Sequence, residues 1–222
     1  ELANEKGRDI ITIPGGYPPR AALGYGLIPL VVVLWRMGLI ADPREEVSGA
    51  VETAREAVRC FGAAVPTVDN RAKQLAEWFR GHVPVVYGTA PTTFAVAHRW
   101  TGQLAENSKT IAHANELPEM NHNEIVGWGT TTVLAEHARV VFLRDRDDRP
   151  RTSLRAKLTA ATIEDAGAEV RMVDSFGDSP LARMLSLVAT GDFVSYYAAS
   201  LAGVDPTPVT PIDRLKKALA EA

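Results

Sequence analysis

The sequence predicts an α/β fold, a three-layer sandwich with a small parallel sheet, preceded by a helical N-terminal segment. Short runs rich in β-branched residues occur at residues 83–89, 137–144 and 169–174. A helix-type pattern over about residues 153–166 separates the second run from the third. A strand, a helix and a strand at this separation indicate a right-handed crossover between parallel strands.

The N-terminal segment contains an apolar stretch, residues 21–41, that is long enough for a membrane span. Arg36 lies deep within this stretch and Pro29 interrupts it. A charged residue and a helix breaker at these positions favour a helix inside the protein over one in a bilayer. We therefore expect a fully buried helix here and no membrane partner.

Two further helices are expected before the first strand. Asp42 and Pro43 supply an N-cap and a first-turn proline for one of them. The shorter second helix covers residues 72–79. The apolar residues of the first helix recur every three or four positions, at Val47, Val51, Ala54, Val58 and Phe61.

The C-terminal part completes the order of elements. Ser179 begins a long helix, and a proline-rich linker at residues 205–211 leads to a last helix from Ile212 onward. We expect residues 1–82 to form a helical linker and dimerisation segment. Residues 83–222 are expected to form the lobe that contains the sheet.

Composition excludes several classes of partner. The 222 residues carry 24 Lys plus Arg against 27 Asp plus Glu, so the net charge is −3. Bulk attraction to nucleic acid or anionic lipid is therefore not expected. The mixed-charge run at residues 144–155 is expected to be a solvated loop. Cys60, the single cysteine, fits a reducing compartment, and we expect a cytoplasmic protein.

The densest polar segment lies between residues 106 and 124. It contains acids, amides and an imidazole between two segments of buried type, where a proton-transfer site would be sought. A solvated loop with helix caps explains the same residues. The residues alone leave both interpretations open.

The ligand spacing gives little support to a protein-bound metal. Glu119 and His122 stand three residues apart, as in carboxylate-bridged metal sites. Such a site needs a second copy of the motif, and His82 and His113 add no recognisable ligand spacing. We therefore expect no metal.

The turn at residues 88–93 joins a strand to the start of a helix, where free amides and hydroxyls can hold a phosphate. Ordinary N-capping requires the same residue types. Both interpretations stay open for the threonines of this turn, Thr89, Thr92 and Thr93.

Three other positions have two interpretations each. Arg20 follows a turn-rich segment and suits binding of an oxyanion, although an exposed helix-start arginine fits equally well. Thr210 fits a helix N-cap. Lys216 and Lys217 fit solubilising charges that complement a helix dipole.

Four blocks together resemble the prokaryotic dual-specificity phosphoglucose/phosphomannose isomerases, which belong to the sugar-isomerase (SIS) domain group. The blocks are residues 14–25 (PGGYPPRAALGY), 83–88 (VPVVYG), 97–109 (AHRWTGQLAENSK) and 118–128 (PEMNHNEIVGW). The resemblance runs over nearly the entire chain. It implies interconversion of glucose 6-phosphate or mannose 6-phosphate with fructose 6-phosphate through a cis-enediolate.

The resemblance also implies roles for individual residues. Glu106 corresponds to the general base, and Arg20 to the arginine that stabilises the enediolate. His122, 16 residues after Glu106, corresponds to the histidine that assists ring opening in the neighbouring subunit. A homodimer that shares His122 across its interface is therefore expected.

The C-terminal helix is expected to complete the site by the same resemblance. Lys217 corresponds to a lysine that helps to open the ring, with Lys216 as a one-residue alternative. Thr210, seven residues before Lys217, corresponds to a threonine beside C2 and C3 of the sugar. The scheme needs no metal or organic cofactor.

The chain resembles only the C-terminal part of such an isomerase. Family members carry a first lobe with a phosphate cradle, and this sequence begins after it. We expect the chain alone to bind sugar phosphate poorly and to turn over slowly or not at all. A non-catalytic sugar-phosphate-binding regulatory module is the alternative, but Arg20, Glu106, His122 and Lys217 together favour the enzyme, since binding needs no base.

Overall fold

The computed structural model describes residues 5–89, 91–129 and 132–221. The chain divides into two compact units, Glu1–Gly49 and Ala50–Ala222, which are described separately. This boundary lies earlier than the 82/83 boundary expected from the sequence. Most of helix α3 (Arg44–Phe61) and all of α4 (Arg71–Phe79) therefore belong to the unit that holds the sheet.

The first unit contains a short 3₁₀ helix, η1 (Pro19–Ala21), and helix α2 (Leu23–Arg36). None of the residues of α2 is buried, so the expectation of a fully buried helix is wrong. The physical reason is size, because a unit of this length has no second layer with which to cover an apolar helix. Within the described residues, no helix is both long and apolar enough to cross a membrane.

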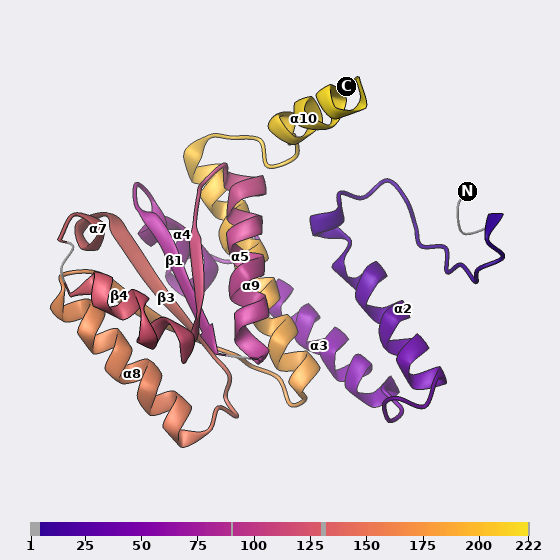
Figure 1. Cartoon of the computed structure of the whole chain (residues 1–222), viewed down its shortest axis with the longest axis horizontal. Helices are drawn as coiled ribbons and strands as arrows, with labels where there is room; N and C mark the ends of the chain where they lie inside the picture. Colours follow the sequence, from indigo (N-terminus) through magenta and orange to yellow (C-terminus); the bar gives the residue numbers. More distant parts are fainter. Residues whose placement is uncertain (1–4, 90, 130–131, 222) are drawn as a thin grey trace. The chain divides into compact units, whose positions relative to one another are not determined.

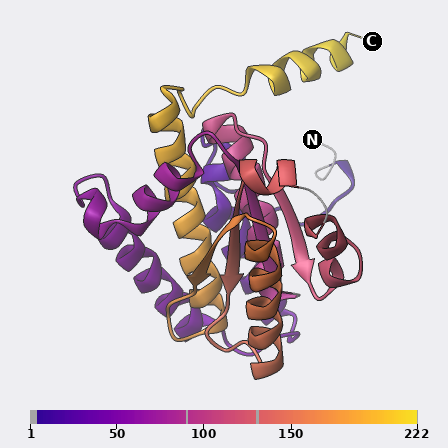
Figure 2. The same cartoon turned by 90° about the vertical axis from the view of Figure 1, so that its left-hand side faces the viewer.

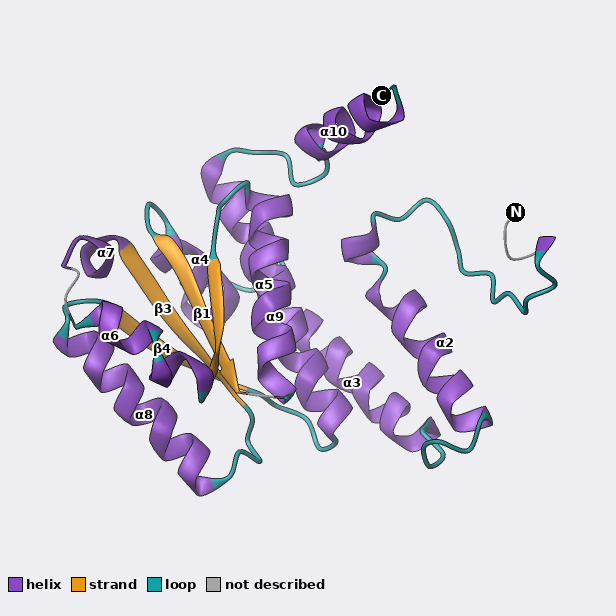
Figure 3. Ribbon diagram, viewed as in Figure 1, coloured by secondary structure: helices purple, strands orange, loops and turns teal. Residues whose placement is uncertain are grey.

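The second unit is built on a four-stranded sheet in the order β2-β1-β3-β4, with every pair of neighbours parallel (Figure 3). This confirms the α/β class and the parallel sheet. The fourth strand, β2, was not expected, because its sequence HANEL is polar and has no β-branched residue. The strands are β1 (Val83–Thr89), β2 (His113–Leu117), β3 (Ala138–Arg144) and β4 (Glu169–Asp174).

Helices cover both faces of the sheet and make three layers (Figure 1). Alternate residues of β1 and β3 point to opposite faces, so Val86 and Val141 join one core while Val85 and Val140 join the other. One face is covered by α4, α5 (Thr92–Ser108) and α9 (Pro180–Ala202), and the other by η3 (Glu119–His122), α6 (Glu124–Trp128), α7 (Thr132–His137) and α8 (Pro150–Asp165).

Two short elements complete the second unit. A 3₁₀ helix, η2 (Thr67–Asp69), precedes α4. Helix α10 (Thr210–Ala220) follows α9 after a short linker and begins two residues before the expected start at Ile212 (Figure 2). No residue of α10 is buried.

Helix α5 is fixed closely against α9. The indole Nε1 of Trp100 donates to the carbonyl oxygen of Leu187 at 2.9 Å. A Cβ atom at Gly191 would lie 2.2 Å from that Nε1, so only glycine allows this approach. Near the end of α5, Asn107 Nδ2 donates to Ser195 Oγ at 2.9 Å. These contacts set both the position and the rotation of α5.

Candidate functional site

The last turns of α5 carry Glu106, the residue expected to act as the base. Its side chain is half-buried, and the neighbouring Asn107 is held by α9. Because α5 returns antiparallel to β1, its C-terminal end lies at the edge of the sheet where the strands begin. The linker that follows α9 reaches the same edge, which brings the C-terminal segment to Glu106.

A cavity of about 680 Å³ opens between the end of α5 and this linker. Glu106 and Thr210, which are far apart in the sequence, both line it. Lys109 lines it as well. The other walls are mainly apolar, and the remaining described lining residues are Ala105, Val204, Asp205, Pro208, Val209, Pro211 and Ile212.

The lysines expected in this site lie elsewhere on α10. Lys217 is exposed and its Nζ lies 3.8 Å from a carboxylate oxygen of Glu221, one turn later. Neither Lys216 nor Lys217 is among the described residues that line the cavity. The structure of the single chain therefore brings together Glu106 and Thr210 but not the expected ring-opening lysine.

Arg20 belongs to the first unit. It is half-buried in η1, directly after the turn-rich segment that ends in Pro18 and Pro19. Glu106 belongs to the second unit. The role that the resemblance implies for Arg20 remains a prediction.

His122 is exposed at the end of η3, immediately before α6. Asn123 caps α6 with its side chain, and Glu124 is the first residue of that helix. An exposed imidazole is available to a neighbouring molecule. The expected role of His122 in a partner subunit also remains a prediction.

A polar cluster holds Glu124 against the sheet. Its carboxylate accepts hydrogen bonds from Tyr87 Oη and Asn115 Nδ2, and it lies 3.0 Å from His113 Nε2. Trp128 Nε1 donates to Tyr87 Oη at 2.8 Å, which completes the phenol's hydrogen bonds. The segment that carries His122 is thereby tied to β1 and β2.

The charges of this cluster stabilise one another. Burial by itself would raise the pKa of Glu124, but hydrogen bonds from His113, Asn115 and Tyr87 together lower it below its ordinary value. The hydrogen bond to Glu124 raises the pKa of His113, against a smaller opposite effect of burial. Burial, with Glu124 beside it, raises the pKa of Tyr87, so this phenol keeps its proton.

Two of the three threonine hydroxyls in the turn at residues 88–93 bond within the fold; Ala90 lies outside the described residues. Thr93 Oγ1 accepts from the Thr89 amide at 2.7 Å and donates to the Leu143 carbonyl at 3.0 Å. Thr89 Oγ1 donates to Asp148 at 3.2 Å. Pro91, the N-cap residue of α5, gives no side-chain cap, so ordinary N-capping does not describe the turn, and phosphate binding there stays a prediction.

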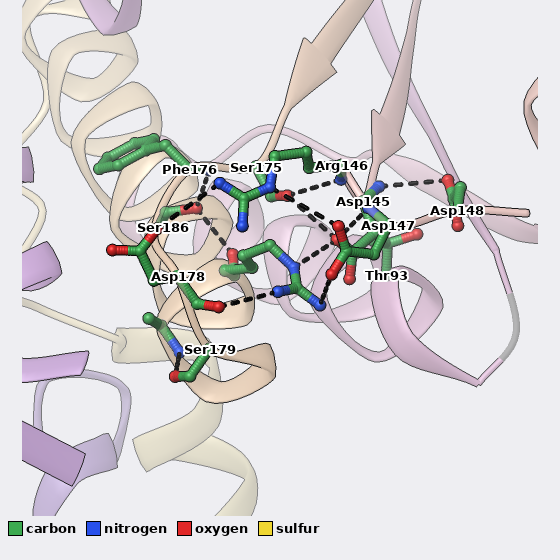
Figure 4. Close-up of polar contacts among 12 residues, drawn as sticks. Thr93, Asp145, Arg146, Asp147, Asp148, Ser175, Phe176, Asp178, Ser179 and Ser186 are labelled. Carbon is green, nitrogen blue, oxygen red and sulfur yellow. Dashed lines mark hydrogen bonds and ion pairs between the residues drawn. The ribbon is translucent and has the colours of Figure 1, made fainter. Parts of the chain in front are cut away.

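The neighbouring charged run at residues 144–155 is not a solvated loop throughout, which corrects the sequence expectation. Arg183 Nε donates to Asp145 Oδ1 at 2.6 Å, and these two side chains are only 7% and 8% exposed. Ser175 and Asp147 join the same network (Figure 4). The carboxyl end of β3 is therefore neutralised from within the fold and favours no added anion.

No described group of three or more His, Cys, Asp and Glu side chains is arranged to hold a metal ion. Glu119, part of the metal alternative, instead accepts a hydrogen bond from Asn123 Nδ2 at 3.2 Å. The two residues that suggested a metal, Glu119 and His122, are the first and last residues of η3.

Sequence reasoning missed the Glu124 cluster and gave Lys109 no role. The cluster depends on β2, in which His113 and Asn115 alternate onto one face. Asn115 is in register with Tyr87 of β1. The alternation in HANEL is a strand signal, but its polar residues lack the apolar pattern that usually indicates a strand.

A family model described as the bacterial phospho-glucose isomerase C-terminal SIS domain matches residues 68–219. The chain is 41% identical over 221 residues to a bifunctional phosphoglucose/phosphomannose isomerase of Caldicellulosiruptor bescii, covering 100% of this chain and 65% of the relative. It is 36% identical over 219 residues to a protein of the same description from Aquifex aeolicus, covering 99% and 64%. The chain thus spans slightly less than two thirds of these relatives.

A solved structure described as a glucose-6-phosphate isomerase like protein from Thermus thermophilus has a similar fold. The TM-score is 0.66 at 23% identity, over 78% of this chain and 57% of that one. At this identity the likeness supports the architecture alone.

Proposed function

Because the chain belongs to the family of bacterial phospho-glucose isomerase C-terminal SIS domains, we propose that it forms the catalytic C-terminal lobe of an aldose–ketose isomerase. The substrates would be glucose 6-phosphate, mannose 6-phosphate and fructose 6-phosphate. The observation that carries the proposal is the cavity lined by both Glu106 and Thr210. It places a carboxylate and a hydroxyl beside one space of suitable size for a small molecule.

The proposed chemistry needs one base. The two aldose phosphates differ only at C2, so removal of the C2 proton from either open chain gives the same enediolate. Glu106 would take this proton and return it to C1 while the hydroxyl proton on O2 passes to O1, which produces fructose 6-phosphate. The negative charge that develops on oxygen would be stabilised by the Arg20 guanidinium. Thr210 would lie beside C2 and C3.

Ring opening requires proton movement between the ring oxygen and the anomeric hydroxyl. We assign this to His122 of a second copy, because an imidazole exchanges protons near neutral pH and this one is exposed. Lys217, or Lys216 beside it, would assist ring opening if α10 brought its side chain to the sugar. The proposal therefore includes a homodimer and requires no cofactor.

The chain spans 64–66% of the length of the first three curated relatives. A complete active site in this proposal also needs phosphate-binding residues supplied from outside this chain. We expect slow turnover or none from the 222-residue chain alone. A rate comparable to that of an intact isomerase would contradict this expectation.

A chimera tests the function directly. This chain would replace the matching region of the Caldicellulosiruptor bescii relative, and conversion of both aldose phosphates would be measured in deuterated water. We expect deuterium transfer to the substrate carbon and loss of about 100-fold or more in kcat for Glu106→Gln, because proton transfer by a positioned base contributes at least this factor. Glu164→Gln, at an exposed position of α8, is the matched control and should leave kcat unchanged.

Two outcomes would overturn the proposal. If the folded chimera bound fructose 6-phosphate without exchanging any carbon-bound proton, a non-catalytic sugar-phosphate-binding module would be favoured. If Glu106→Gln retained full exchange, another residue would have to be the base.

A further inference from the structure

Lys109 ends α5 in an unusual backbone conformation. Its φ of 59° and ψ of 28° are left-handed, and among the described residues it is the only one other than glycine with a positive φ. Helices commonly end in this conformation, but glycine or asparagine normally occupies it because a Cβ atom is unfavourable there. A lysine at this position is therefore not explained by backbone preference, and the contacts of its side chain are the place to look for a reason.

The side chain of Lys109 joins two segments that are 99 residues apart. Its Nζ donates to the carbonyl oxygen of Glu106 at 2.6 Å and to that of Pro208 at 2.7 Å. The first acceptor is one of the last carbonyls of α5. The second belongs to the linker between α9 and α10. The ammonium group also lies where the helix dipole favours a positive charge.

The residues that carry the two acceptors both line the cavity. Glu106 is on the wall formed by α5, and Pro208 is on the linker wall, two residues before Thr210. Lys109 itself lines the cavity between them. One ammonium group therefore links the backbone of the expected base to the linker that leads to the expected sugar-binding hydroxyl.

We propose that Lys109 is a positioning residue, whose two carbonyl hydrogen bonds fix the linker and Thr210 at the distance from Glu106 that the isomerase reaction needs. This inference rests on the proposed function for its catalytic consequence. Its structural part, the attachment of the linker to α5, stands independently. Lys109 acts through the backbone and transfers no proton.

Three substitutions separate this role from simple helix capping. Lys109→Met keeps the length of the side chain and removes its donors, while Lys109→Arg keeps donors. Lys109→Gly removes the side chain and suits the positive φ. The expected order of linker attachment is therefore wild type, then arginine, then methionine and glycine.

Hydrogen exchange of the 222-residue chain measures the attachment. The amides of Ile212 and Asp213 donate to the Val209 carbonyl at 2.8 and 3.2 Å, so they report on the ordered start of α10. We expect about tenfold faster exchange of these amides in Lys109→Met and Lys109→Gly, with partial return in Lys109→Arg. Lys109→Gly should unfold at no lower urea concentration than wild type, because glycine relieves the backbone.

Lys73 offers a matched control. Its Nζ also donates to two carbonyls, those of Ala63 and Val65, at 2.8 and 2.7 Å, but it lies on α4. Lys73→Met should leave the exchange of Ile212 and Asp213 unchanged. Equal exchange in wild type, Lys109→Met and Lys109→Gly would overturn the inference, and so would an effect of Lys73→Met as large as that of Lys109→Met.

Kinetics of the chimera test the catalytic consequence. We expect Lys109→Met and Lys109→Gly to lower kcat about tenfold or more, since small misplacement of reacting groups is costly, and Lys109→Arg to restore part of it. The KM for fructose 6-phosphate should change less. Unchanged kcat in an active chimera would overturn the positioning role. An inactive chimera with native Lys109 would count against the proposed function, while the exchange experiment would still decide the attachment.

Discussion

The two ends of helix α5 are both rich in polar groups, yet they differ in what those groups do. At the N-terminal end, Thr89 and Thr93 bond to each other and to nearby main chain and Asp148. At the C-terminal end, Glu106 and Thr210 face a cavity. The first end resembles a ligand site in sequence, but its polar groups are used to hold the fold together.

The difference shows that a high density of polar residues in the sequence does not by itself identify a ligand-binding site. In open α/β sheets, ligands commonly bind at the carboxyl ends of the strands, where the strand order reverses. Here the strand order reverses between β1 and β3, and Asp145, which directly follows β3, is buried in an ion pair with Arg183. The proposed site lies instead at the other edge, where two segments distant in the sequence enclose a space.

The largest effect is expected near the N-terminal end of α5, where Arg183 and Asp145 form a buried ion pair. Arg183→Met leaves the Asp145 carboxylate buried without its main partner and should lower the free energy of unfolding by about 3 kcal/mol. Urea unfolding checks this value. Arg146→Met, whose side chain is 52% exposed, is the control and should cost less than about 1 kcal/mol. Equal stability of the two variants would contradict the claim that the buried ion pair of Arg183 and Asp145 holds this end of the fold together.

A substitution between the two ends tests whether α5 is rigid. Gly191→Ala brings a Cβ atom against the Trp100 indole and should destabilise the chain by about 2 kcal/mol. Gly102→Ala, on α5 itself, meets nothing within 4 Å and should be neutral or stabilising, because alanine favours a helix. Thermal or urea unfolding compares them. A neutral Gly191→Ala would show that α5 can shift on α9 without cost.

The smallest effect is a pH dependence of the Glu124 cluster, which lies on the face of the sheet opposite α5. The pKa of His113 is raised from its ordinary 6.5, so its stabilising contribution is complete below pH 6.5 and is lost as pH rises through the folded pKa. The pKa of Glu124 is lowered from 4.5, so its contribution is present above pH 4.5 and is lost as pH falls. The pair therefore stabilises the fold most between these values.

Unfolding by urea at about pH 5.5 and about pH 8 measures this dependence. Because His113 is half exposed, we expect a loss of less than about 1 kcal/mol at the higher pH, which His113→Gln abolishes. The same pH dependence in His113→Gln and wild type would assign it to another group.

Much of the architecture could be predicted from local pattern. The strands at residues 83–89 and 169–174 were expected from β-branched runs, and the long helix after Ser179 from its cap and proline. Strand β2 was not predicted, because an edge strand with polar residues lacks the apolar signal on which such reasoning depends. The exposed surface of α2 was also not predicted, since burial depends on what the rest of a unit can cover.

The sequence by itself determined the α/β class, the family and the candidate residues, because helix periodicity, capping and the four blocks are written in neighbouring positions. Only the tertiary structure decided which candidates meet. It placed Glu106 and Thr210 on one cavity, gave Lys109 a carbonyl partner on the distant linker at Pro208 and turned the Thr93 hydroxyl toward the Leu143 carbonyl. These contacts join residues far apart in the chain, and their formation depends on how α5, α9 and the sheet pack together.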